Sequence, residues 1–280
     1  DAVRQNAGEV TNSGIELSVF GSPVKNETFE WRVIANFSNN KQEVTKLAPG
    51  LEDLALTSGF SGLSIRAEEG EQFGLYGAGW DRSPDGDIII NATTGERERG
   101  GRARLGNINP DYQLGIMNTV TYKNFTVSAL VDISKGGVLW SGTVGGIRGS
   151  GVAAETAENR GRVFIDNGVN RIDNGDGTFS YVENQTPVRS MQDFWNTYTN
   201  GSNTEGSVFD ASYVKLREVT ISYRIPNGLL SGTPLKAASI GFEARNLWLI
   251  DSEVPHIDPE ASFFGPGLIG GQANVEFYNV

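Results

Sequence analysis

Polar and apolar residues alternate along several segments of the chain, and a period of two is typical of β-strands whose two faces meet different surroundings. The clearest case is Asp210–Pro226, DASYVKLREVTISYRIP, which a short turn rich in Pro and Gly joins to Pro234–Trp248, PLKAASIGFEARNLW. Two alternating segments joined by a short turn predict an antiparallel hairpin.

The same alternation predicts two further hairpins. In the first, a strand within Gly14–Gly21 precedes the turn Ser22–Glu27 and a strand that starts at Phe29. In the second, strands starting at Tyr112 and Phe125 flank a two-residue turn, Lys123-Asn124. In the return strand of the second hairpin and in the third, the apolar face is expected to hold Phe125, Val127, Ala129, Val131, Ile133, Ile221, Tyr223, Ile240 and Phe242. The opposite face is expected to hold Thr126, Ser128, Asp132, Glu243 and Arg245.

The alternation changes phase within the first strand of the third hairpin. Val214 and Leu216 are apolar at even positions, whereas from Val219 onward the odd positions are apolar. Because a one-residue slip would turn every following side chain to the wrong face, a β-bulge near Arg217-Glu218 is expected. The alternative is that both faces of the strand are buried at this point.

The expected strands are connected in two very different ways. Short turns join the members of each hairpin, whereas more than sixty residues separate Val44 from Tyr112 and more than seventy separate Trp140 from Tyr213. Structureless loops of this length are unusual in compact soluble domains, but outer-membrane barrels combine short periplasmic turns with long external loops. The sequence therefore predicts an all-β fold: an antiparallel transmembrane β-barrel segment with long, irregular extracellular loops and all short turns on one rim.

Aromatic residues stand near both ends of the expected strands, as they do in the interfacial girdles of such barrels. Tyr122, Phe125 and Tyr223 lie near short turns, and Trp140 and Trp248 lie at the far ends of their strands. In a soluble sandwich the same residues would belong to the core.

The composition excludes several other classes of protein. A net charge of −11 argues against a nucleic-acid partner, and the absence of cysteine excludes disulfides and thiolate metal sites. No run of 18 apolar residues encodes a transmembrane helix. A hydrophobic content of 38% and 36 glycines, about twice the usual share of glycine, suit strands with one polar face and long loops.

Four stretches of the chain resemble the SusC-like, TonB-dependent outer-membrane transporters of the Bacteroidetes type. They are NSGIELSV at Asn12–Val19, GNINPDYQLGIMNTVTYKNFTVSALVDISKGG at Gly106–Gly137, DASYVKLREVTISYRIP at Asp210–Pro226 and IGFEARNLWLI at Ile240–Ile250. The resemblance covers nearly the whole chain. It implies that residues 1–280 are the C-terminal portion of a receptor barrel, with the plug and the N-terminal strands absent and the last strand truncated.

The resemblance also implies a location and a function. The parent protein would lie in the bacterial outer membrane, in contact with its lipid, and would not be an enzyme. It would import an oligosaccharide or, less often, a peptide, together with a SusD-like surface lipoprotein. TonB would act through the missing N-terminal part. The alternative function is a secreted all-β carbohydrate-binding or adhesion domain, which would purify without detergent.

Few residues suggest catalysis or metal binding. The single histidine, His256, has Asp251, Glu253 and Asp258 nearby in sequence, so it is either a metal ligand or part of a solvated acidic loop. Two further loops carry oxygen ligands that suit calcium, and no other cofactor is expected. Formation of tight turns is the alternative explanation for them. The candidate calcium ligands are Asp81, Asp85, Asp87, Asp173 and Asp176.

Aromatic residues in the long connections are the better candidates for substrate binding. Tyr76, Trp80 and Trp195 are expected to offer flat ring faces that stack on sugars. Alternatively, Trp195 and its neighbour Tyr198 belong to a short helix that starts after Ser190 and packs beneath the loop. For Tyr198 packing is the favoured interpretation.

Overall fold

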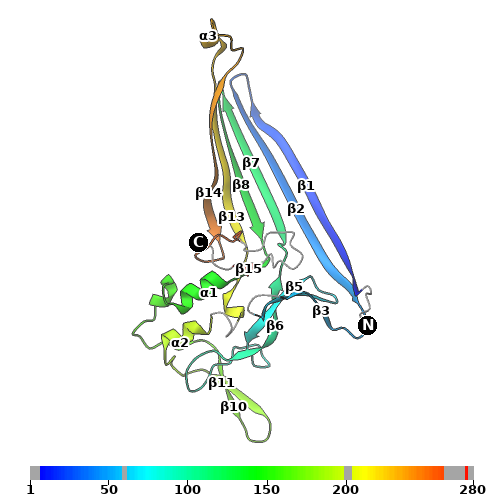
Figure 1. Ribbon diagram of the computed structural model, residues 1–280, viewed down its shortest axis with the longest axis vertical. Helices are drawn as coiled ribbons and strands as arrows, with labels where there is room; N and C mark the ends of the chain where they lie inside the picture. The colour runs from blue at the N-terminus through cyan, green and yellow to red at the C-terminus, as the bar shows by residue number, and fades with distance from the viewer. Residues whose placement is uncertain (1–6, 59–61, 199–203, 262–274, 277–280) are drawn as a thin grey trace.

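The computed structural model describes residues 7–58, 62–198, 204–261 and 275–276. A long, narrow β-sheet forms one part of the molecule, and a lobe of short strands and helices lies at one end of it (Figure 1). Within the described residues, no helix is long and apolar enough to cross a membrane.

The long sheet contains the three predicted hairpins side by side, in the order β1-β2-β7-β8-β13-β14, with every neighbouring pair antiparallel. The predicted strands are therefore confirmed, although the first two extend further than the alternation indicated. Their bounds are β1 Gly8–Lys25, β2 Phe29–Leu47, β7 Tyr112–Tyr122, β8 Phe125–Lys135, β13 Tyr213–Arg224 and β14 Ser239–Ser252.

All three short turns lie on one rim, as predicted, and the lobe lies at the other (Figure 1). Hydrogen bonds join neighbouring turns: Lys123 N donates to Thr28 O at 2.8 Å and Arg224 N donates to Asn124 O at 2.9 Å. Lys123 adopts φ 53°, which a two-residue hairpin turn requires of a central residue. The third turn contains the short helix α3 (Asn227–Leu230).

The register places the predicted apolar and polar residues on opposite faces of the sheet. Residues paired directly across antiparallel strands share a face. An apolar row crosses all six strands and consists of Val19, Ala35, Ile116, Val131, Leu216 and Trp248. A polar row on the other face consists of Arg32, Thr119, Ser128, Thr220 and Glu243.

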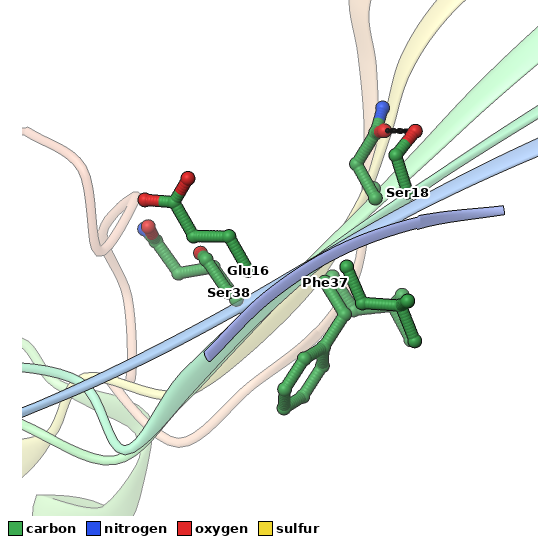
Figure 2. Close-up of a pocket in the computed structure, with 9 residues that line it drawn as sticks. Glu16, Ser18, Phe37 and Ser38 are labelled. Atoms are coloured by element: carbon green, nitrogen blue, oxygen red, sulfur yellow. Dashed lines mark hydrogen bonds between the residues drawn. The ribbon is translucent and has the colours of Figure 1, made fainter. Parts of the chain in front are cut away.

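Figure 2 shows this separation near the middle of β1 and β2, where Glu16, Ser18 and Ser38 project to one side of the strands and Phe37 to the other. A shallow depression there is lined by residues of both faces, and Gly115 of β7 contributes no side chain to it. It is therefore a dent in a thin sheet and not an enclosed site.

The polar face includes an apolar row, which departs from the predicted pattern. At a single level across four strands it is apolar, and the row there consists of Phe20, Ile34, Met117 and Leu130. On the next two strands the row continues as Glu218 and Arg245.

The predicted bulge is present at Arg217. Leu216 pairs with Val131 and Glu218 pairs with Leu130, so two steps along β13 match one step along β8. Arg217 is the extra residue, and the odd-numbered positions that follow return to the apolar face. The apolar residues before and after Arg217 therefore lie on the same face of the strand. This confirms the bulge and not the alternative that both faces are buried there.

The long connections were predicted to be irregular loops, but they form a lobe with its own sheets. This part of the prediction was wrong because the strands in the lobe are short and glycine-rich and therefore show no clear alternation. A four-stranded antiparallel sheet consists of β3 Asp53–Ser58, β4 Ser64–Glu68, β5 Gly74–Trp80 and β6 Arg99–Asn107. The other strands are β9 Val138–Ser141, β10 Val169–Asp173, β11 Phe179–Glu183, β12 Val208–Asp210 and β15 Val275–Glu276. The helical segments are α1 Gly142–Gly149, α2 Met191–Asn196 and the single 3-10 turns Ala154–Ala157 and Glu205–Ser207.

The buried apolar core lies in the lobe. One cluster centres on Leu63, Leu75 and Trp140, and a second joins Val44 and Leu47 at the end of β2 to Ala67. Trp140 is only 1% exposed, so its assignment to an interfacial girdle was wrong. Strand β9 turns into the lobe there and carries the indole into the core. Trp248, by contrast, is 61% exposed on the apolar face of the sheet.

Candidate functional site

Two of the three aromatic residues predicted to bind substrate are buried in the lobe. Tyr76 and Trp80 lie on β5 and are each 6% exposed. The Tyr76 hydroxyl donates a hydrogen bond to Glu68, and burial raises its pKa to about 12, with the Glu68 carboxylate adding to the effect. Trp80 packs edge-on against Tyr198 at 5.3 Å. Little of either ring is therefore open to a ligand in this structure, and their role in binding stays a prediction.

Trp195 lies at a different place, on the short helix α2, where it is half-buried. The Ser190 hydroxyl oxygen accepts a hydrogen bond from Asp193 N at 3.2 Å and caps this helix, as the packing alternative predicted. Tyr198 follows α2 and packs against Trp195 at 5.2 Å. Burial raises the pKa of Tyr198 to about 12, so the phenol is neutral in its packed position.

Two arginines complete this aromatic cluster. Arg97 lies 5.5 Å from the rings of both Trp80 and Tyr198, and it forms a two-pronged ion pair with the buried Asp166, with Nε to Oδ2 at 2.6 Å. Arg148, from α1, lies 5.7 Å from the Trp195 ring centre. Cations over ring faces stabilise such clusters, and here they join α1, α2 and β5.

Beside this cluster the lobe has a depression of about 400 Å³. It lies where the end of α1, the turn that follows and the start of α2 meet, and Trp195 forms part of its wall. Two cationic side chains, Arg148 and Arg160, also line it. Of the three predicted substrate-binding aromatics, only Trp195 borders this depression.

Arg148 forms an ion pair with an acidic residue, Glu155. Its Nε donates to Glu155 Oε1 at 2.7 Å, and the other oxygen of Glu155 lies 2.8 Å from His256 Nε2. Burial alone would raise the pKa of Glu155, but the hydrogen bonds from Arg148 and His256 outweigh it and lower the pKa to about 2. His256 thus packs against the helix-bearing part of the lobe, and not against Asp251, Glu253 or Asp258 as a metal ligand would.

A second set of charges lies where the polar face of the sheet meets the lobe. Lys215 is buried on β13, and its Nζ binds Glu260 Oε2 at 2.6 Å and Asp258 Oδ1. Arg217, the bulge residue, binds Asp132 Oδ2 at 2.7 Å and Glu260. We call these five residues the ionic clasp, because they tie the segment that follows β14 back onto the wall of the sheet.

Two of the five candidate calcium ligands accept hydrogen bonds within tight turns. Asp173 Oδ1 accepts from Gly175 N at 2.8 Å, and Asp176 Oδ1 accepts from Thr178 N at 2.9 Å. Asp81 forms an ion pair with Arg171, while Asp85 and Asp87 are exposed. In the part of the chain that the structure describes, no group of three His, Cys, Asp or Glu side chains could hold a metal. These bonds support the turn explanation, and calcium stays a prediction.

Neither the depression nor the clasp was foreseen from the sequence. The arginine-containing GGIRGSG at Gly145–Gly151 was the only local signal for the depression. For the clasp, the phase change at Arg217 was predicted, but its carboxylates lie far away in sequence, at Asp132 on β8 and at Asp258 and Glu260 after β14.

The six-stranded antiparallel sheet, with one apolar and one polar face, short turns at one rim and a lobe at the other, defines the class of protein as an outer-membrane β-barrel wall. Comparisons with known proteins then indicate which barrels it resembles. No family model matches the chain.

Three curated proteins of Formosa agariphila are similar in sequence. TonB-dependent receptor P3 is 27% identical over 92% of this chain and 26% of its own length, and TonB-dependent receptor P26 is 25% identical over 96% and 27%. TonB-dependent receptor P39 is 42% identical over 27% of this chain. The chain thus spans about a quarter of the length of the two relatives that it matches throughout.

Solved structures agree in fold. The RagAB peptide importer in its closed-closed state has a TM-score of 0.64 and 19% identity over 97% of this chain and 28% of its own. In its open-open state the TM-score is 0.62. Together the comparisons confirm the resemblance to SusC-like TonB-dependent transporters and the outer-membrane location. The relatives are receptors and transporters, and not enzymes.

Proposed function

We propose that this chain forms part of the wall and of the extracellular surface of a TonB-dependent importer of large nutrients. In this assignment the substrate is an oligosaccharide or, less often, a peptide. A SusD-like surface lipoprotein is the partner that helps to capture it. TonB supplies energy through a part of the receptor outside residues 1–280. The similarity to TonB-dependent receptors over 92% of the chain supports the proposal.

The observation that carries the proposal is the exposed apolar face of the long sheet. Ile15, Phe242 and Ile240 are 65%, 67% and 69% exposed, although they are large and apolar. A soluble protein rarely leaves so continuous an apolar surface open to water. Lipid covers this face in our proposal, and the face with Ser128, Asp132 and Glu243 borders the lumen.

The proposed class of substrate is argued from the lobe and its depression. RagAB, which has the same fold, is described as a peptide importer. In this chain the depression beside Trp195 combines an aromatic ring with polar and cationic groups. This combination favours an oligosaccharide, since sugars stack on aromatic rings while their hydroxyl groups bind polar side chains.

Deletion of the gene in the source bacterium tests the proposal. We expect loss of uptake of a fluorescently labelled nutrient oligosaccharide, with uptake restored by the intact receptor but not by a receptor that lacks its TonB-contacting segment. A panel of oligosaccharides and oligopeptides serves as substrates. Unchanged uptake of every member, or purification of the intact protein without detergent, would contradict the proposal and favour a secreted binding domain.

A further inference from the structure

The depression beside α1 and α2 has the features of a built binding site. It lies on the lobe, at the end of the sheet opposite the short turns. Its lining consists of Arg148, Gly149, Ser150, Gly151, Thr156, Arg160, Met191, Gln192 and Trp195. No carboxylate is among these residues, so its lining carries positive charge although the chain as a whole has a net charge of −11.

Arg160 is held in a fixed orientation by neutral groups. Its Nε donates to Thr156 O at 3.1 Å, and its Nη2 donates to Thr156 Oγ1 at 3.2 Å and to Gly151 O. Thr156 is itself 1% exposed, so this anchor is rigid. Within the described part of the chain Arg160 forms no ion pair. Its charge is therefore uncompensated, and Nη1 is left to bind a ligand.

Gly151 lies directly against the guanidinium group of Arg160. It adopts φ 70°, where side chains are disfavoured, and a Cβ there would lie 2.8 Å from Arg160 Nη2. The positive φ of Gly151 is the stronger reason for a glycine at this position, and its backbone carbonyl accepts a hydrogen bond from Arg160 there.

Arg148 and Trp195 form the more buried part of the lining of the depression. The Arg148 side chain is 14% exposed and is neutralised by Glu155, so it positions the aromatic ring more than it attracts a ligand. Trp195 is half-buried, and its indole Nε1 is buried without a hydrogen-bond partner among the described residues. The combination is one free cation beside the exposed part of an aromatic ring.

We propose that this depression binds an acidic residue of an oligosaccharide. Its carboxylate or sulfate group binds Arg160, and its sugar ring packs against Trp195. The two N–H groups of Nη1 carry the positive charge of a guanidinium whose orientation is fixed, and charged N–H donors form strong hydrogen bonds to the oxygens of carboxylate and sulfate groups. Helical segments and turns line the depression and no strand edge does, so the main-chain pairing by which many extended peptides bind is not offered here. This inference rests on the proposed import function and narrows its substrate class.

The test measures binding to the intact receptor, purified in detergent, by isothermal titration calorimetry. The probes are an oligogalacturonate hexamer for carboxylates, a κ-carrageenan hexasaccharide for sulfates, neutral maltohexaose and a hexaglutamate peptide.

We expect one of the two acidic oligosaccharides to bind, and Arg160→Gln to weaken its binding at least about tenfold. Arg160→Lys keeps the charge but loses the hydrogen bonds to Thr156 and Gly151 that fix the orientation of the cation, and should weaken binding by a smaller factor. Trp195→Ala should also weaken the binding of the acidic oligosaccharide relative to the wild type.

Arg162→Gln is the matched control, since it removes the same charge from an exposed side chain two residues away and should leave binding unchanged. Binding of neither acidic oligosaccharide overturns the inference, as does equal weakening by Arg160→Gln and Arg162→Gln. Tighter binding of hexaglutamate than of either oligosaccharide overturns the sugar assignment. In each of these cases uptake that still depends on the receptor would leave the proposed function standing, whereas loss of that dependence would remove both.

Discussion

At the scale of single residues, the ionic clasp shows how charges are used where the sheet meets the lobe. Lys215 is 5% exposed, and its ammonium group is stable there because Asp258 and Glu260 surround it. Burial alone would raise the pKa of Glu260, but hydrogen bonds from Arg217, Lys215 and Tyr213 outweigh it and lower the pKa to about 2. The segment after β14 is held by these bonds.

This lowered pKa predicts how the clasp responds to acid. Because the carboxylate is stabilised in the folded state, the contribution of Glu260 is complete above its ordinary pKa of 4.5 and is lost as the pH falls towards about 2. Hydrogen exchange of residues 253–261 in the intact receptor, corrected for intrinsic rates, should therefore quicken between pH 6 and pH 3. Glu260→Gln should show faster exchange already at pH 6 and a smaller further change, whereas Glu253→Gln, on an exposed side chain, should behave like the wild type. Equal pH dependence in all three proteins would contradict the role of Glu260.

At the scale of elements, the bulge in β13 keeps the faces of the strand consistent. Residues Tyr213–Leu216 and Glu218–Arg224 would lie out of phase without the extra residue at Arg217. The bulge also turns the Arg217 side chain to the polar face, where it reaches Asp132. One inserted residue therefore corrects the register and supplies a cation to the clasp.

Removing the extra residue should be far more harmful than removing its side chain. Deletion of Arg217 would move Lys215 to the apolar face and Leu216 to the polar face, so we expect failure of barrel assembly. Arg217→Ala keeps the bulge and should assemble, with a loosened clasp. The migration of unheated samples on SDS gels, which separates folded from unfolded barrels, measures the difference. Normal assembly of the deletion variant would show that register is set elsewhere.

At the scale of the whole molecule, the two faces of the long sheet decide where it can reside. Val127 is 42% exposed on the apolar face, and Ser128 is the next residue, on the polar face of the same strand. In our proposal the first contacts lipid and the second contacts the lumen. The pair offers a matched test of this orientation.

An arginine should be tolerated on one face and not on the other. We expect Val127→Arg to destabilise the intact receptor in lipid by about 1 kcal/mol, since a charge facing hydrocarbon is costly and Val127 lies close to the rim of turns, where the cost is smaller than at the bilayer centre. Ser128→Arg should change the stability by less than about 0.5 kcal/mol. Guanidinium unfolding in lipid bilayers measures both. A larger loss for Ser128→Arg would reverse the assignment of the two faces.

The sequence by itself determined the long sheet. Its three hairpins, the partition of Phe125, Val127 and Ile221 from Thr126 and Ser128, the common rim of turns and the bulge near Arg217 all follow from a period of two residues. This is possible because the pattern is local. Each side chain reports which of two surroundings it meets, and a change of phase is visible within a few residues.

Only the tertiary structure decided the lobe and its sites. Strands such as β5, GLYGAGW, have no alternation and are stabilised by partners far away in sequence. The burial of Tyr76, Trp80 and Trp140, and the union of Lys215 with Glu260, depend on how the chain returns to the end of the sheet. The position of Arg160 beside Trp195 likewise depends on packing between α1 and α2, because contacts between distant segments leave no periodic trace in either one.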